Sequence, residues 1–193
     1  MMHELVLKNR SYRRFNQEYP VDRNTLYELI ELARLTGSGK NAQALKYLVS
    51  ADPELNARVF HTLKWAAYLK DWGGPVEGER PSAYVVVLDD TAIEENPVCD
   101  RGIAMQTILL GAVERGLGGC ILGAINRGEL ATLLALPKHL RIGNVIALGQ
   151  PKESIVIEGL REDGDVRYWR GADGVHHVPK RPLSEIIVGY KAL

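Results

Sequence analysis

The stretch Asn9-Arg10-Ser11-Tyr12-Arg13-Arg14-Phe15 places three guanidinium groups and a serine hydroxyl close together, just after the short apolar run at residues 5–7. An arginine side chain presents a planar fork of donors that matches phosphate oxygens or the carbonyl edge of a heterocycle. A serine hydroxyl adds one more donor with little steric demand. The alternative for such a run is a solvated basic turn, and the stretch alone leaves both interpretations open.

The overall composition excludes several classes of protein. The length of 193 residues and the hydrophobic content of 46% predict one domain with a real core. Lys+Arg and Asp+Glu both count 24, so the basic excess of a nucleic-acid binder is missing. No apolar run reaches the roughly 18 residues of a membrane span, and His3 and Glu4 do not fit a signal peptide. Cys99 and Cys120 are too few for a disulfide scaffold, which favours a reduced, cytoplasmic setting.

Hydrophobic periodicity predicts alternating helices and strands as far as residue 148. Helices are expected at 5–7, at 22–35 with Asp22 as N-cap, at 53–63, from about 97 to 116, and at 128–136; strands are expected at 45–50, 83–88, 120–123 and 142–148. The strand at 83–88 is almost continuously apolar, so we expect it at the centre of a sheet and covered on both faces. The helix from Pro97 is apolar around much of its surface, which predicts burial in a large core or against a partner subunit.

Two regions break this pattern. Residues 64–82 are long, irregular and aromatic, and Trp65, Tyr68 and Trp72 there fit either a substrate lid or core and dimer packing. After residue 151 the chain becomes more polar, with a turn predicted at 162–165 and an edge strand at 166–169. The tail at 178–188 cannot bury its apolar residues alone, so we expect it to dock elsewhere.

Five stretches together resemble the nitroreductase family of flavoproteins. They are Arg10-Ser11-Tyr12-Arg13; Ser38 to Gln43, which is similar to the family's Ser-x-x-Asn-x-Gln loop; Asp100-x-Gly102-x-Ala104-x-Gln106; Gly118-Gly119-Cys120-Ile121-Leu122-Gly123; and Lys180-Arg181-Pro182-Leu183-x-Glu185. They follow the family's order and cover nearly the whole chain.

The resemblance implies an α+β fold with a central, mainly antiparallel sheet flanked by helices, in an intertwined homodimer. The whole chain, 1–193, would be one domain, with a dimer-wrapping extension from about 165 and a possible lid at 64–82. The implied function is an FMN-dependent oxidoreductase. Hydride would pass from NAD(P)H to flavin N5 and then, in a ping-pong cycle, to a nitroaromatic, quinone or related small-molecule acceptor.

The resemblance also implies a role for each stretch in binding the flavin. Arg10, Ser11, Lys180 and Arg181 would hold the phosphate. Arg13 would face the O2 edge of the ring, where a positive charge stabilises the reduced flavin. Asn41 would hydrogen-bond the same edge, and a backbone N–H of Leu122 or Gly123 would reach N5. The complete cofactor-binding set is Arg10, Ser11, Tyr12, Arg13, Ser38, Asn41, Gln43, Cys120, Ile121, Leu122, Gly123, Lys180 and Arg181. No side chain is assigned as catalytic and no metal is expected, because the flavin carries the chemistry.

Some features depart from the family pattern or leave alternatives open. Asn9 stands in place of the family's first arginine, and Ala44 in place of a usual proline. Cys120 occupies a position beside the ring, where a small apolar role competes with a nucleophilic one. Other flavin chemistry on this fold, such as dehydrogenation, reductive dehalogenation or flavin fragmentation, remains a competing function. So do a flavin carrier without turnover and a dimeric interaction protein that has lost the cofactor.

Overall fold

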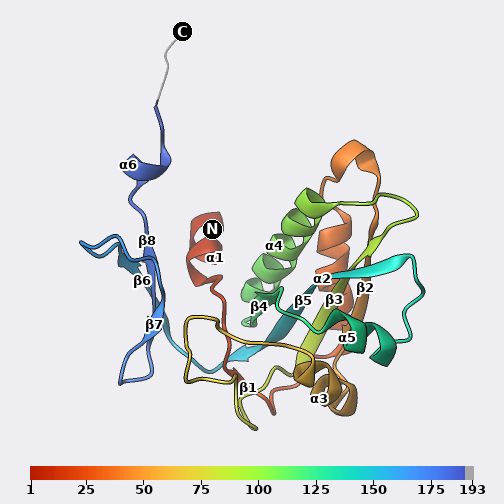
Figure 1. The fold of residues 1–193 in the computed structure, drawn as a ribbon, viewed down its shortest axis with the longest axis horizontal. Coiled ribbons are helices and arrows are strands. Elements are labelled where there is room, and N and C mark those ends of the chain that lie inside the picture. The colour runs from red at the N-terminus through yellow and green to blue at the C-terminus, as the bar shows by residue number, and fades with distance from the viewer. Residues whose placement is uncertain (190–193) are drawn as a thin grey trace.

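The computed structural model describes residues 1–189 (Figure 1). The first part of the chain forms α1 (Met2–Lys8), β1 (Phe15–Asn16), α2 (Arg23–Arg34), a short 3-10 turn (Gly39–Asn41), β2 (Leu45–Ser50), α3 (Pro53–His61), β3 (Ala83–Asp90), α4 (Val98–Glu114), β4 (Gly118–Leu122), α5 (Arg127–Leu133) and β5 (Leu140–Pro151). The remainder forms β6 (Ile155–Gly159), β7 (Trp169–Arg170), β8 (His176–Lys180) and α6 (Leu183–Ile186). No helix among the described residues is long and apolar enough to cross a bilayer.

The main sheet runs β1-β5-β3-β2, and β4 also pairs with β5. Each of these four pairings is antiparallel. All eight residues of β3 are buried, as its apolar sequence predicts. Strand β5 is longer than expected, because it continues to Pro151, which lies opposite Phe15 of β1. The α+β fold with a mainly antiparallel sheet is confirmed.

Two hydrophobic clusters cover the two faces of this sheet. Because successive strand residues point to opposite faces, Val85 and Val87 of β3 pack with α2 and α4, whereas Tyr84 and Val86 pack toward α3 and α5. Figure 1 shows α2 and α4 running beside each other, and they make extensive contact. The predicted N-cap of α2 is confirmed, because Asp22 accepts a hydrogen bond from the Thr25 backbone N–H at 2.9 Å.

The long helix predicted from Pro97 is confirmed as α4. Its inner face buries Ala104, Ile108 and Ala112 against the sheet and α2. Val98 and Ile103 are 51% and 46% exposed. These two apolar side chains are therefore left uncovered by the described residues of this chain.

A second, three-stranded sheet follows, in the order β6-β8-β7. An edge strand is present as predicted, but its predicted bounds of 166–169 are wrong, because strand pairing is confined to Trp169 and Arg170. The residues before Trp169 make local hydrogen bonds instead of strand pairs. Asp165 accepts hydrogen bonds from both the backbone N–H and the side chain of Arg167. The turn at 162–165 is present, with Gly164 at φ 73°.

The end of the chain projects away from the main body, as Figure 1 shows for α6. Leu183, Ile186, Ile187 and Val188 are all exposed, between 59% and 103%. This agrees with a tail that does not bury its apolar residues in its own chain. Residues 190–193 of the predicted extension lie outside the described residues.

Candidate functional site

A first cavity, of about 280 Å³, is lined by donors from both ends of the chain. Arg10, Ser11 and Arg13 come from the segment between α1 and β1, and Lys180 comes from the end of β8. The other lining residues are Asn9, Ile155, Tyr168, His176 and Val178. No carboxylate is among them, so the cavity has the charge and the donors that an anion requires.

The segment at 10–15 is fixed in place by contacts with β4 and the core. Phe15 is fully buried, and the Tyr12 backbone N–H donates to the Gly119 carbonyl oxygen at 3.0 Å. The Tyr12 hydroxyl donates to the Lys8 carbonyl oxygen, and its ring packs so closely that a Cβ on Gly118 would lie 2.5 Å from it. Of the predicted residues, Tyr12 therefore supports the segment and does not line the cavity.

Arg13 and Arg14 have different partners. The Arg13 guanidinium donates to the Ser11 carbonyl oxygen at 3.1 Å and lies over the Tyr168 ring, 4.9 Å from its centroid. Arg14 instead forms a two-pronged ion pair with Glu79, with Nε 2.6 Å from Oε2. Arg13 is therefore the one of the two whose side chain reaches the cavity.

A second cavity, of about 390 Å³, adjoins the first, because Arg13 and Tyr168 line both. Its wall includes the predicted run from Cys120 to Gly123, together with Lys64 and Trp65 from the irregular segment. Cys120 is 2% exposed, and burial raises the pKa of its thiol despite the opposing charge of Arg13. A protonated, buried thiol acts as a small apolar wall and is a poor nucleophile.

The loop from Ser38 to Gln43 lies elsewhere in the chain. The Gly39 backbone N–H donates to Asp100 in the first turn of α4, and Ser38 Oγ accepts from the Gln43 backbone N–H at 3.0 Å. Lys40, Asn41 and Gln43 all have positive φ, between 53° and 55°. Non-glycine residues adopt this region rarely, and such strain concentrates at functional sites.

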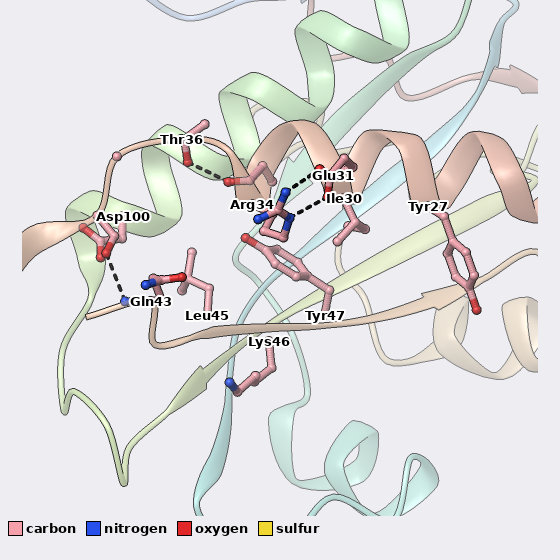
Figure 2. A pocket seen from close by; sticks show the side chains of 13 residues that line it. Tyr27, Ile30, Glu31, Arg34, Thr36, Gln43, Leu45, Lys46, Tyr47 and Asp100 are labelled. Carbon is pink, nitrogen blue, oxygen red and sulfur yellow. Dashed lines mark hydrogen bonds and ion pairs between the residues drawn. The ribbon is translucent and has the colours of Figure 1, made fainter. Parts of the chain in front are cut away.

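Ser38 and Gln43 line a third cavity, of about 450 Å³, between α2 and β2 (Figure 2). Strand β2 is three strands from β4 in the sheet order, a lateral separation of roughly 14 Å at the usual strand spacing. Register adds to this, because Leu45 lies level with Arg141 of β5, whereas Cys120 lies opposite Ala147. Within one chain, the predicted residues therefore form two separate groups.

The two basic residues at the end of β8 also differ. Lys180 lines the first cavity, whereas Arg181 is an exposed residue whose guanidinium pairs with Glu185 at 2.7 Å. Only Lys180 is thus brought to the other predicted phosphate ligands.

A family model described as the Nitroreductase family matches residues 6–150. The chain belongs to the nitroreductase family. A relative from Archaeoglobus fulgidus whose name contains "NADH dehydrogenase/NAD(P)H nitroreductase" is 26% identical over 78% of this chain and 85% of its own. A relative named iodotyrosine deiodinase, from Thermotoga neapolitana, is 24% identical over 98% of this chain and 97% of its own. A structure from Exiguobacterium sibiricum, solved in complex with FMN, has a TM-score of 0.66 at 16% identity, covering 79% of this chain and 89% of that one.

Among the residues of this nitroreductase-family chain that were not predicted at the site, Tyr168 and His176 line the first cavity, and Glu153 lies behind it, bonded to the backbone of Arg13 and Arg14. His176 is 1% exposed, with Nε2 3.5 Å from the Arg13 guanidinium. Burial and the nearby charges of Arg13 and Arg170 lower its pKa to about 4, so the ring is neutral at neutral pH.

The neighbouring His177 points away from His176, stacks on Trp169 and bonds Glu158. No cluster of metal-ligating residues occurs among residues 1–189. The sequence shows His176 and His177 only as adjacent histidines, and that pattern does not distinguish a cavity wall from a surface pair.

Proposed function

We propose that this protein is an FMN-dependent oxidoreductase that takes hydride from NAD(P)H and passes it to a nitroaromatic, quinone or related acceptor in the same cavity. The observation that carries the proposal is the pair of adjoining cavities that share Arg13 and Tyr168. One is rich in phosphate-binding donors and the other has an apolar, aromatic wall. Family membership and the nitroreductase name of a relative support the same activity.

The residues of the first cavity fit the phosphate of FMN. Arg10, Ser11 and Lys180 supply two cations and a hydroxyl with no carboxylate among the lining residues. Arg10 Nε is buried without a partner among the described residues, so this donor has spare capacity. These residues would bind the phosphate by charge-assisted hydrogen bonds.

The residues of the second cavity fit the flavin ring. Arg13 lies at the junction of the cavities, where its guanidinium would orient the carbonyl edge of the ring and stabilise negative charge there. The bound FMN would supply the hydride chemistry. Trp65, Cys120 and Tyr168 would form the walls that exclude water, and no side chain has to act as acid or base.

We further propose that the complete site belongs to a homodimer. The loop of Ser38, Asn41 and Gln43 is remote from Arg13 within one chain, while Val98 and Ile103 of α4 and the apolar tail remain uncovered among the described residues. A second copy would cover these surfaces and bring its own Ser38 loop to the flavin. Residues 165–193 and 64–82 would then act as the dimer-wrapping extension and the lid.

The deciding experiment is a visible spectrum of the purified protein with and without NADH or NADPH, followed by addition of a quinone. We expect a yellow protein that bleaches on reduction and recovers with the quinone, and we expect mass spectrometry of the heat-released cofactor to identify FMN. Released FAD, or a colourless protein that does not take up added FMN, would contradict the proposal. A yellow protein that NAD(P)H does not bleach would be a flavin carrier.

Reductive dehalogenation is the second candidate. The alignment with the deiodinase relative covers 98% of this chain and therefore extends through the second sheet. The alignment with the nitroreductase relative covers 78% of this chain. Anaerobic reoxidation of the reduced protein by an iodinated phenol, compared with a quinone, distinguishes the two candidates. Release of iodide at a rate that matches flavin reoxidation would favour dehalogenation.

A further inference from the structure

Glu153, between β5 and β6, is a buried carboxylate that no sequence motif singles out. Its side chain is 1% exposed. Oε1 accepts hydrogen bonds from the backbone N–H groups of both Arg13 and Arg14, while Oε2 accepts one from the Arg170 guanidinium at 2.9 Å. A buried carboxylate held by three donors is costly to disturb, because any donor that is lost leaves an uncompensated charge.

The first consequence concerns Arg13. Its side chain is held by Ser11, His176 and Tyr168, but its backbone is held by Glu153. Glu153 itself lines neither of the two site cavities. Its contact with the site runs through Arg13, because its hydrogen bond fixes the backbone from which the Arg13 side chain extends.

The second consequence concerns the irregular segment at 64–82. Arg170, the cationic partner of Glu153, lies over the ring of Trp72 with its guanidinium carbon 4.7 Å from the centroid. Arg14, whose backbone also bonds Glu153, carries the ion pair to Glu79 near the C-terminal end of the same segment. One carboxylate is thus connected to Arg13 and, by two routes, to the segment whose residues 64–67 line the second cavity.

We propose that Glu153 is a positioning residue that sets Arg13 for the flavin and couples flavin binding to the conformation of residues 64–82. This rests on the proposed FMN site, because Arg13 is assigned to the flavin there. In the coupled state, FMN on Arg13 and a closed 64–82 segment stabilise each other. By linkage, removing the connection weakens both.

The test compares Glu153→Gln with Glu158→Gln. Both remove a carboxylate from the same region of the chain, but Glu158 bonds His177 and does not contact the site. We expect Glu153→Gln to weaken FMN binding about 10-fold or more, because three bonds lose their charge assistance. It should also speed amide hydrogen exchange at residues 9–16 and 64–82 in the FMN-free protein. Glu158→Gln should change neither quantity.

The reduction potential of the bound flavin separates positioning from simple charge removal. Loss of a nearby anion alone makes the potential more positive, whereas displacement of Arg13 makes it more negative. We expect a more negative potential in Glu153→Gln at saturating FMN. A more positive potential, or unchanged FMN affinity, would overturn the positioning role.

Arg170→Lys isolates the coupling and covers the case in which Glu153→Gln fails to fold. Lysine keeps the charge near Glu153 but cannot stack its head group flat on Trp72. We expect faster exchange at 64–82 and unchanged exchange at Arg13 and Arg14. Unchanged exchange at 64–82 in this variant would overturn the coupling. A wild-type protein that binds no FMN would refute the proposed function, while the exchange measurements on FMN-free protein would still test the link.

Discussion

Replacing Arg13 with alanine should weaken FMN binding by roughly 10-fold to 150-fold. Arg13 is a half-buried cation that joins both cavities. A hydrogen bond to a charged group contributes about 1.5–3 kcal/mol, and each 1.4 kcal/mol corresponds to about a factor of ten in affinity. Within the protein, the Arg13 side chain makes one hydrogen bond to a carbonyl oxygen, one long contact with His176 Nε2 at 3.5 Å and one ring contact with Tyr168. Its loss should therefore cost more in flavin affinity than in fold stability.

The assay is a titration of FMN-free protein with FMN, followed by spectroelectrochemistry of the loaded protein. The potential should become more negative, because a positive charge near the flavin carbonyl edge favours the reduced form. Arg14→Ala is the matched control, since its guanidinium is paired with Glu79. That variant should disturb the 64–82 segment and leave the potential nearly unchanged.

The reasoning would be refuted if Arg13→Ala left both the FMN dissociation constant and the potential at wild-type values. A larger effect from Arg14→Ala would move the role to that residue instead. Circular dichroism and a melting curve for each variant establish that the comparison is made between folded proteins.

Three further predictions concern the lid, the tail and pH. Tyr68 is 52% exposed, and its ring centroid lies 5.0 Å from that of Tyr168 with the ring planes tilted by 59°. Tyr68→Ala should therefore change kcat/KM for bulky acceptors more than the rate of flavin reduction; equal losses together with a lower Tm would indicate packing instead. Deleting residues 182–193 should release FMN and yield monomeric or insoluble protein; a monomer in sedimentation with wild-type FMN affinity would contradict the shared site. The pKa of His176 is lowered to about 4, below its unfolded value of about 6.5, so the unfolded state binds the proton first. The free energy of unfolding, measured with urea, should therefore fall by about 2–3 kcal/mol as the pH is lowered from 6.5 to 4. The His176→Asn variant should lack this decrease. The same pH dependence in the variant and the wild type would show that another group titrates.

The elements that the sequence predicts well are those whose signals are local. Asp22 marks the start of α2 because a side-chain cap acts within three residues, and the apolar run of β3 requires cover on both faces wherever the strand lies. The strand predicted at 166–169 starts only at Trp169, for an equally local reason. Asp165 occupies the Arg167 backbone N–H, and such side-chain bonds compete with strand pairing.

The second sheet depends on contacts that no local pattern encodes. Strands β6 and β8 pair in parallel, although the chain between them makes a turn that would suit a hairpin. For the same reason Tyr168 and His176 could not be predicted at the cavity, since only this pairing brings them to Arg13. The family resemblance grouped Arg10, Ser11, Arg13 and Lys180 although they lie at opposite ends of the chain, and these four residues line one cavity; their role in binding a flavin stays a prediction.

A site divided between two chains would tie flavin binding to assembly. If FMN binds the dimer and not the monomer, each bound flavin stabilises the dimer by RT ln(1 + [FMN]/Kd), about 2.7 kcal/mol at a hundredfold excess over Kd. The structure offers a reason for this dependence. The Ser38–Gln43 loop holds three non-glycine residues at positive φ, a conformation that costs free energy and persists only when its surroundings maintain it. Asp100 supports one end of this loop within its own chain, and the flavin and the facing subunit would support the rest. The dimer dissociation constant should therefore fall as FMN is added, and sedimentation at several FMN concentrations measures that fall directly.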